Sequence, residues 1–224
     1  MAFFVKPWLD QAGKFPITYV GGIPHFNQPF DSKAPRAGVL HTTEGGWEGS
    51  MAIFKRHYAP HFILGMDASQ GKVRIAQLVQ VGTIGGALRA HNNKAIVQIE
   101  MVGFSKETPW LPDDDTLEAL ASLMAVCWKE YGIPLEHPWK DGDWGKSGDN
   151  PHRQSKLYGQ KAGWFGHGDC PKPDEHWDPG NLKWSAVFDL ANKRAEDLAI
   201  SAPMAMAGPA SMGPPTPFER SRST

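Results

Sequence analysis

The stretch AIVQIEMVGF, residues 95–104, is the part of the sequence that most directly indicates the fold. It is a strongly apolar run with β-branched residues, which predicts a buried strand, and a single charge at Glu100 interrupts it. An ionised carboxylate in such a run costs free energy unless it is paired, hydrogen-bonded or close to a metal. Glu100 is therefore either a strand-edge residue that faces solvent or a buried group beside a cleft. In the second case desolvation would raise its pKa, which suits a general base.

Other apolar runs indicate further strands around this one. RAGVLHT, residues 36–42, predicts a buried strand that ends in polar residues, among them His41. HFILGM (61–66) and GKVRIAQLV (71–79) are separated by the turn sequence DASQG. This arrangement predicts two antiparallel strands of a hairpin.

Two segments have the apolar spacing of amphipathic helices. In DDDTLEALASLMAVCWKEYG (113–132) Asp115 and Glu118 resemble a capping box, and the glycine at position 132 ends the helix. A final helix is predicted to start near DPGNLKW (178–184). Strands and helices thus alternate. We expect an α/β (α+β) fold with a central mixed β-sheet flanked by helices and a functional site at one edge or end of the sheet.

Length and composition are those of an ordinary globular chain. With 224 residues and 41% hydrophobic residues, the chain suits one domain with a sizeable core. Its formal charge of −1 gives no general attraction to nucleic acid or anionic membranes, so we expect no nucleic-acid partner. We also expect a monomer. The two cysteines, Cys127 and Cys170, do not make a disulfide framework. No apolar run approaches the roughly 18 residues of a membrane span, so no membrane span is expected.

Three segments are distinguished along the chain. Residues 1–35 are rich in Pro, Gly and aromatic residues and are expected to form an irregular arm packed on the domain. Residues 36–199 hold the predicted strands and helices, and residues 200–224, without periodicity, are expected to be a disordered tail. The start, MAFFVKPWLDQAGKF, is a poor secretion signal, because its apolar run is short and no small-residue cleavage site follows. We therefore expect a soluble chain made in the cytoplasm.

The polar stretch GHGDCPKPDEHWDPG, residues 166–180, contains candidates for metal ligation. Together with His41, its His167 and Asp178 offer two imidazoles and one carboxylate, the ligand set of a catalytic zinc site with a position open for water. His176 lies two residues before Asp178, so in an extended loop both side chains would project to one side, beside the metal. Taken singly, His167 also suits a loop histidine and Asp178 a helix N-cap.

In four places the sequence resembles the zinc-dependent N-acetylmuramoyl-L-alanine amidases, whose fold is shared with amidase-type phage lysozymes and peptidoglycan recognition proteins. The matching stretches occur in the family's order: VLHTTEG (39–45), HFILGMDASQGKVRIAQLV (61–79), AIVQIEMVGF (95–104) and GHGDCPKPDEHWDPGNLKW (166–184). The resemblance implies a peptidoglycan or muropeptide substrate, cleavage of the amide between N-acetylmuramic acid and L-alanine, and Zn2+ as cofactor.

The resemblance also implies a role for each candidate residue. It makes His41, His167 and Asp178 the zinc ligands, Glu100 the residue that activates water, and His176 the group that stabilises the developing oxyanion. Histidine ligands must be neutral to bind a metal, so activity should fall below roughly pH 6.

The sequence departs from the family in two places. Pro60 stands where phage amidases often carry a catalytic tyrosine, so that role is not carried over. The loop from His167 to Asp178 is one residue longer than in the cytoplasmic muropeptide-recycling amidases, which leaves the substrate subclass open. Cys170 has ligand spacing to His167 but falls away from the family's ligand positions, and we do not assign it to zinc. The other acidic residues of the loop are interpreted as loop polarity: Asp169, Asp174 and Glu175.

Two other functions are compatible with this sequence. One is a peptidoglycan-binding module of the same fold without turnover, although the presence of all three candidate ligands and Glu100 argues against it. The other is a zinc peptidase that cuts within the stem peptide. A phage endolysin released through a membrane pore to the cell wall in the periplasm, a cytoplasmic recycling amidase and a delivered antibacterial effector all fit the chain.

Overall fold

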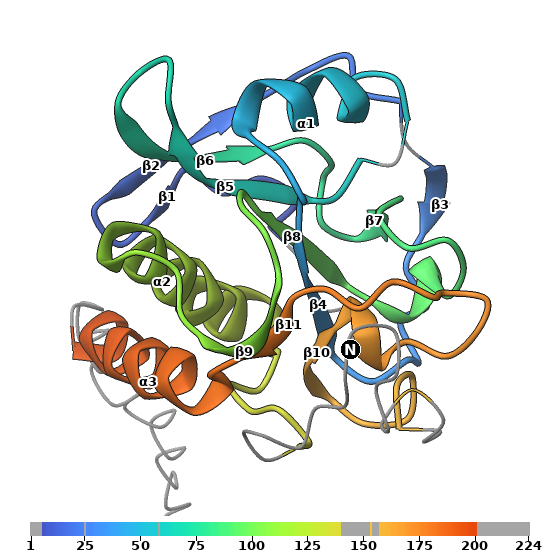
Figure 1. The fold of residues 1–224 in the computed structure, drawn as a ribbon. Coiled ribbons are helices and arrows are strands. Elements are labelled where there is room, and N and C mark those ends of the chain that lie inside the picture. The colour runs from blue at the N-terminus through green and yellow to red at the C-terminus, as the bar shows by residue number, and fades with distance from the viewer. Residues whose placement is uncertain (1–5, 25, 58, 140–152, 154–156, 201–224) are drawn as a thin grey trace, which may run out of the picture.

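A seven-stranded mixed β-sheet forms the centre of the fold, in the order β1-β2-β6-β5-β8-β4-β10 (Figure 1). The structure is a computed structural model that describes residues 6–24, 26–57, 59–139, 153 and 157–200. The strands are β1 (Gln11–Ala12), β2 (Phe15–Tyr19), β3 (Phe26–Pro29), β4 (Ala37–Thr42), β5 (Phe62–Asp67), β6 (Lys72–Gln77), β7 (Thr83–Ile84), β8 (Val97–Met101), β9 (Lys106–Trp110), β10 (Gly163–Gly166) and β11 (Gly180–Leu182). The α-helices are α1 (Trp47–Phe54), α2 (Asp114–Tyr131) and α3 (Trp184–Ile200). The predicted central mixed sheet flanked by helices is confirmed.

The predicted strand within residues 95–104 is β8, near the middle of the sheet. β8 pairs in parallel with β5 on one side and with β4 on the other. β5 and β6 form the predicted antiparallel hairpin. In the register of β4 and β8, His41 lies opposite Glu100, so the two polar residues of these apolar strands are direct neighbours.

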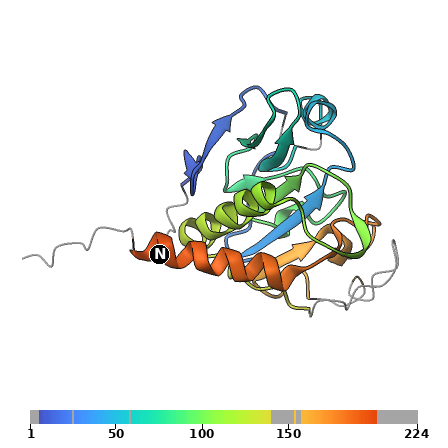
Figure 2. The same cartoon turned by 60° about the vertical axis from the view of Figure 1, so that its left-hand side comes forward.

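Different helices cover the two faces of the sheet. In β5, Phe62 and Leu64 belong to the main apolar core with residues of α2 and α3. Ile63, between them, belongs to a smaller cluster with Trp47 and Met51 of α1. Successive side chains of a strand point to opposite faces, so α2 lies on one face and α1 on the other. Figure 2 shows α2 and α3 packed side by side along the sheet.

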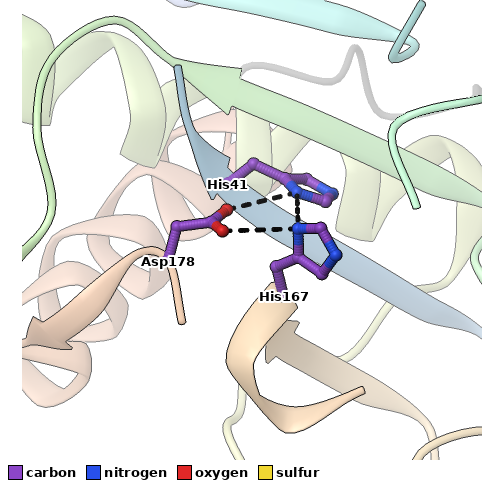
Figure 3. Close-up of side chains that lie close together, drawn as sticks. All are labelled: His41, His167 and Asp178. Atoms are coloured by element: carbon purple, nitrogen blue, oxygen red, sulfur yellow. Dashed lines mark hydrogen bonds and ion pairs between the residues drawn. The ribbon is translucent and has the colours of Figure 1, made fainter. Parts of the chain in front are cut away.

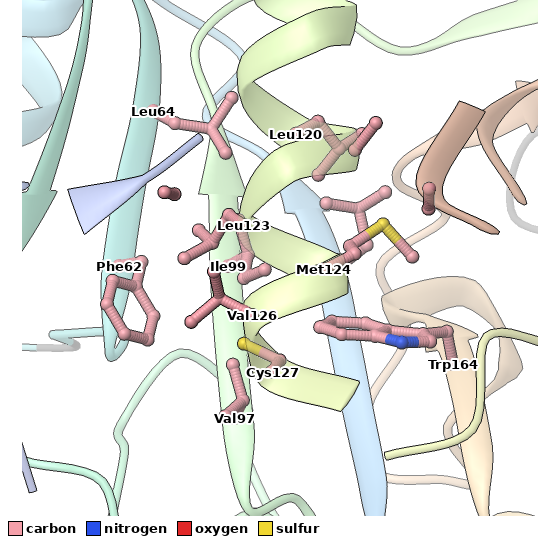
Figure 4. Close-up of a cluster of buried hydrophobic side chains, with 14 of the residues drawn as sticks. Phe62, Leu64, Val97, Ile99, Leu120, Leu123, Met124, Val126, Cys127 and Trp164 are labelled. Atoms are coloured by element: carbon pink, nitrogen blue, oxygen red, sulfur yellow. The ribbon is translucent and has the colours of Figure 1, made fainter. Parts of the chain in front are cut away.

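The same alternation in β8 separates the core from the functional candidates. Val97 and Ile99 point into the main core under α2 (Figure 4), and Met101 belongs to the same core. Glu100 therefore points to the α1 face, and His41 is its neighbour on β4. Every second residue of β8 thus packs in the main core, and the residues between them point to the opposite face of the sheet.

The N-cap of helix α2 lies two residues before the one predicted from the capping box, Asp115. Its N-cap is Asp113, whose carboxylate accepts hydrogen bonds from the Thr116 backbone N–H (3.0 Å) and the Thr116 hydroxyl (2.8 Å). This bond satisfies one of the free N–H groups of the first turn, so Asp115 is not needed as a cap. The helix ends as predicted at Gly132, which adopts a left-handed φ of 68°.

Helix α3 starts later than the predicted position near residue 178. Residues 180–182 form β11, which pairs in parallel with β9, so the chain is extended there. The alternative interpretation of Asp178 as a helix N-cap is therefore wrong. Trp184 begins α3 and is buried, as are Val187 and Ala191 on the same face.

Composition predicted an irregular arm over residues 1–35, but residues 6–24 and 26–35 contain three short strands, β1, β2 and β3. β1 and β2 extend the central sheet, and β2 pairs in parallel with β6. The buried amide of Gln77 in β6 fixes the segment before them, because it accepts from the Leu9 N–H (2.9 Å) and donates to the Pro7 carbonyl (2.8 Å). These bonds join residues about 70 positions apart, which local composition does not report.

The described chain ends with α3 at residue 200. The predicted disordered tail lies, from residue 201 onward, outside the described residues. Among the helices of the described ranges, none is long and apolar enough to cross a membrane.

Replacing Gly38 by alanine is expected to lower the free energy of unfolding by about 1–3 kcal/mol through overpacking. A Cβ at position 38 would lie 2.5 Å from ring atoms of Trp164, which is fully buried beside Met124 of α2 (Figure 4). Urea denaturation measures the effect. Gly49→Ala is the matched control, because Gly49 lies in α1 with no atom within 4 Å of its Cβ position. Equal urea midpoints for Gly38→Ala and the wild type would contradict this packing.

Candidate metal centre

The side chains of His41, His167 and Asp178 meet beside the end of β4 (Figure 3). Nδ1 of His41 lies 3.0 Å from Nδ1 of His167. Each of these nitrogens lies 3.3 Å from one carboxylate oxygen of Asp178. All three residues are buried, with exposed fractions of 1%, 3% and 4%. Two nitrogen donors and one oxygen donor therefore converge on one point.

This donor set fits a zinc ion. Adjacent ligand atoms of a tetrahedral zinc site lie about 3.3–3.6 Å apart, given ligand bonds of about 2.0–2.2 Å. The observed separations of 3.0 and 3.3 Å are close to this spacing. With Asp178 ionised, no arrangement of protons satisfies all three contacts, because both contacts to Asp178 need a proton on each Nδ1, whereas the contact between the histidines needs a lone pair on one of them. A cation between the two nitrogens and the carboxylate would satisfy all three residues at once.

The strand order explains why residues far apart in sequence meet here. β4 and β10 are adjacent parallel strands, with Gly166 opposite Leu40, so their carboxyl ends lie together. His167 follows β10 directly in a short 3-10 turn, His167–Asp169. Asp178 is held there because its carboxylate accepts from the Thr42 N–H (3.3 Å) and its carbonyl accepts from the Gly168 N–H (2.9 Å).

The two histidines differ in protonation in the metal-free protein. Burial lowers the pKa of His41 to about 4. Burial acts in the same direction on His167, but the charges and hydrogen bonds of Asp178 and Asp174 outweigh it and raise the pKa of His167 to about 9. Burial alone would raise the pKa of Asp178, yet the neighbouring His167 holds that pKa well below its ordinary value. Near neutral pH the site holds a neutral His41, a cationic His167 and an ionised Asp178.

Glu100 is a buried carboxyl group beside this centre. It is 8% exposed, and its Oε2 has no hydrogen-bond partner among the described residues. Burial, together with the negative charge of Asp178, raises its pKa to about 8. A buried carboxyl group that titrates near neutral pH is suited to taking up a proton and giving it back.

His176 lies at the exposed rim of the same site. Its ring is stacked on the ring of His167, with centroids 4.7 Å apart and an interplanar angle of 4°. Its Nδ1 lies 3.7 Å from Oδ1 of Asp178, and its side chain is 68% exposed. The His176 ring is thus far more exposed than the donor cluster beside it.

One pocket of about 670 Å³ opens onto these residues. Its lining includes Glu100, His167, His176 and Asp178, together with Arg89 and Ile53. The structure therefore brings all five candidates from the sequence together: four line the pocket, and the fifth, His41, contacts two of the four.

Two of the three acids interpreted as loop polarity are buried. Asp169 is 1% exposed, accepts from the Gly166 N–H (2.7 Å) and lies 3.1 Å from Nε2 of His137. Asp174 is 0% exposed and lies 3.3 Å from Nε2 of His167. The loop-polarity interpretation is wrong for both, and it holds for the exposed Glu175.

Arg153 was not singled out in the sequence, yet its side chain is buried against the loop that carries the candidate ligands. Its guanidinium donates to the carbonyl of Cys170 (3.1 Å) and to the carbonyls of Asp174 and His176. The Cys170 thiol faces the Gly166 carbonyl at 3.8 Å, and burial raises its pKa far above the ordinary value. Cys170 does not belong to the donor cluster found among the described residues.

Glu44, also absent from the sequence candidates, joins the ends of β4 and β8. It has a left-handed φ of 49°, which is uncommon for a residue other than glycine. Its Oε1 accepts from the Thr42 hydroxyl (2.7 Å), the Ser105 N–H (2.9 Å) and the Ser105 hydroxyl (2.6 Å). The strands that carry His41 and Glu100 are thereby fixed to each other just beyond the site.

Comparison with known proteins gives one family. The family model described as N-acetylmuramoyl-L-alanine amidase matches residues 31–181. The Staphylococcus aureus hydrolase AmiA matches with a TM-score of 0.52 and 15% identity, over 86% of this chain and 89% of that chain. This likeness shows the shared fold.

Two further solved structures match at lower TM-scores. The amidase LysC from Clostridium intestinale has a TM-score of 0.46 and 14% identity over 79% of this chain and 97% of that chain. The endolysin of Thermus scotoductus bacteriophage Ph2119 has a TM-score of 0.45 and 18% identity over 78% and 98%. No curated protein sequence gives a significant match. Because the family model spans more than half of its residues, the chain belongs to the N-acetylmuramoyl-L-alanine amidase family.

Proposed function

We propose that this chain is a zinc-dependent hydrolase of the amide that joins the lactyl group of N-acetylmuramic acid to L-alanine, in peptidoglycan or muropeptides. The observation that carries the proposal is the position of Glu100 beside the converging donors of His41, His167 and Asp178: Glu100 lies opposite His41 in the sheet and shares one pocket with the other two. A module that only binds peptidoglycan gains nothing from a buried carboxyl group without a partner, because such burial costs free energy. A hydrolase needs a proton acceptor at this place.

His41, His167 and Asp178 would hold the ion through the three atoms that already converge. A zinc ion bound there polarises a carbonyl and lowers the pKa of water towards about 7. The two nitrogen ligands come from different strand ends and the oxygen ligand from the loop, so the binding residues are fixed by the sheet rather than by one flexible segment.

Glu100 would act first as a base and then as an acid. Its free Oε2 takes a proton from the water that attacks the scissile carbonyl carbon. It then delivers that proton to the nitrogen of L-alanine as the C–N bond breaks, which leaves a carboxylic acid on the lactyl group and a free amine on the peptide.

His176 would donate an N–H to the oxyanion that develops on the carbonyl oxygen. Its exposed ring at the pocket rim leaves a nitrogen available for this contact. The loss of one such donor typically costs about 10²–10³ in turnover. The stacking on His167 keeps the His176 ring beside the ligand set.

Digestion of purified peptidoglycan tests this function against its rivals. We expect the zinc-loaded protein, but not the chelated protein, to release peptides with a free L-alanine amine and to leave the glycan strands intact, as measured by mass spectrometry. Cleavage between amino acids of the stem would instead identify a peptidase. Tight binding with no new chain ends in either sample would identify a binding module.

Zinc affinity is expected to rise with pH until about pH 9. In the metal-free protein His167 is cationic below its pKa of about 9, and zinc must displace its Nδ1 proton, whereas His41 with a pKa of about 4 is already neutral. Each displaced proton increases the affinity by about tenfold per pH unit. Competition from protons is therefore expected to begin at a higher pH than for an ordinary histidine, and the fall of activity below roughly pH 6 stays a separate prediction.

Competition with a chelator of known affinity, repeated at several pH values up to about pH 9, measures how steeply the zinc affinity rises with pH. The Glu100→Gln variant removes the second group that titrates in the site, since the pKa of Glu100 is about 8. An affinity that stays constant above about pH 7, the range in which an ordinary histidine is neutral, would contradict the raised pKa of His167.

A further inference from the structure

Asp174 is a buried carboxylate whose bonds reach two separate parts of the site. It is 0% exposed, and its Oδ1 lies 3.3 Å from Nε2 of His167. The same oxygen accepts from the Arg89 N–H at 2.6 Å, and Oδ2 accepts from the Ala90 N–H at 3.2 Å. Arg153 donates to the Asp174 carbonyl and so fixes its backbone. A buried side chain with three partners, on a backbone that is itself held, does not serve merely as loop polarity.

The contact with His167 determines which of its nitrogens carries a proton. An ionised carboxylate only accepts hydrogen bonds, so Nε2 of His167 must be the protonated nitrogen. In a neutral imidazole the other nitrogen, Nδ1, then presents its lone pair, and this is the atom that faces His41 and Asp178. The same bond prevents the ring from turning over, since a turned ring would lose it.

The bonds to residues 89 and 90 hold Asp174 independently of His167. These two backbone N–H groups lie 85 and 84 residues away in sequence, on the segment that supplies Arg89 to the pocket wall. Nε2 of His41, in contrast, is buried without a hydrogen-bond partner among the described residues. Of the two candidate histidine ligands, therefore, only His167 has a carboxylate at the nitrogen that faces away from the donor cluster.

We infer that Asp174 is a positioning residue of the metal centre, which fixes the tautomer and the ring orientation of His167 through Nε2 and joins this ligand to the pocket wall at residues 89–90. The inference rests on the proposed zinc site. Carboxylates behind histidine ligands typically contribute about 10–100-fold to metal affinity.

The inference is tested by measuring the zinc affinity of three variants and of the wild type by chelator competition. Asp174→Asn keeps an oxygen that accepts from Nε2–H and should weaken binding about tenfold, whereas Asp174→Leu keeps the approximate volume without any acceptor and should weaken binding about 100-fold. Glu175→Gln is the matched control, because it removes the same charge from the next residue, which is exposed, and it should bind as the wild type does.

Nitrogen-15 NMR of the histidine rings gives a second readout that a loss of general stability would not move. In the zinc-loaded wild type, Nε2 of His167 should carry a hydrogen-bonded proton that exchanges slowly with water. In Asp174→Asn this proton should exchange faster, and in Asp174→Leu it should no longer be observed. If the leucine variant does not fold, the asparagine variant and its ring spectrum decide.

Wild-type zinc affinity in Asp174→Asn together with an unchanged His167 proton would overturn the inference. An equal loss in Glu175→Gln would also overturn it, because loop charge would then account for the effect. Both readouts are independent of hydrolysis. A wild-type chain that fails to cleave peptidoglycan but shows the predicted order of zinc affinities refutes the proposed reaction and supports the role of Asp174.

Discussion

Glu100→Gln is expected to lower the rate of amide hydrolysis by about 10²–10⁴ while the protein still binds one zinc ion. Glutamine has nearly the same shape as glutamate, but it cannot take a proton from water. Glu100 is not among the three converging donors, so the metal site itself should remain intact. Activity on peptidoglycan and zinc content per chain are the two measurements.

Thermal unfolding of this variant tests whether misfolding, rather than the loss of the proton acceptor, accounts for the lower rate. Because the folded-state pKa of Glu100 is raised to about 8, its contribution to stability is fully present below the unfolded pKa of about 4.3 and is lost as the pH rises through 8. Glutamine has no such loss, so the metal-free variant should unfold at no lower temperature than the wild type at pH 8. Glu107→Gln, an exposed change on β9, is the control and should keep full activity. Full activity in Glu100→Gln would remove Glu100 from the reaction.

Asp178→Asn is expected to abolish both zinc binding and hydrolysis. The amide retains the size of the side chain and an oxygen for the Thr42 N–H, but it loses the charge that attracts the cation. A ligand that binds only the folded protein stabilises it by about 4 kcal/mol at 1,000 times its Kd. Zinc should therefore raise the thermal midpoint of the wild type and leave that of Asp178→Asn unchanged.

Cys170→Ala is the counterpart of this experiment, because Cys170 is the other candidate ligand of the loop. Its thiol is buried against the Gly166 carbonyl, and its raised pKa disfavours the thiolate that a metal needs. The variant should keep zinc and activity and lose only some stability. If Cys170→Ala lost both while Asp178→Asn kept both, our assignment of the ligands would be wrong.

The parts of the fold predicted from sequence are those that local patterns determine. Alternation and apolar content identify β8, and the same pattern makes Glu100 conspicuous as a charge within a strand. His41 is conspicuous for a similar reason, at the polar end of β4. These signals lie within about ten residues of the group concerned, so no knowledge of the tertiary structure is needed.

The parts that could not be predicted depend on contacts between distant residues. Asp174 is distinguished from its neighbour Glu175 only by the N–H groups of residues 89 and 90, which the fold brings to it. Arg153 donates to carbonyls of the loop that carries the ligands, and Glu44 accepts from the N–H and the hydroxyl of Ser105. The N-terminal strands join the sheet beside a buried Gln77. In each case the decisive partner is far away in sequence.

X-ray absorption spectroscopy at the zinc edge tests the central claim most directly, because it reports the atoms around the ion itself. For the zinc-loaded wild type we predict one zinc per chain with a first shell of nitrogen and oxygen at about 2.0–2.2 Å, two imidazoles among its members, and no sulfur. In Asp178→Asn this signal should be absent. A sulfur ligand at about 2.3 Å, or a protein that takes up no zinc under metal-replete conditions, would contradict a centre built from His41, His167 and Asp178.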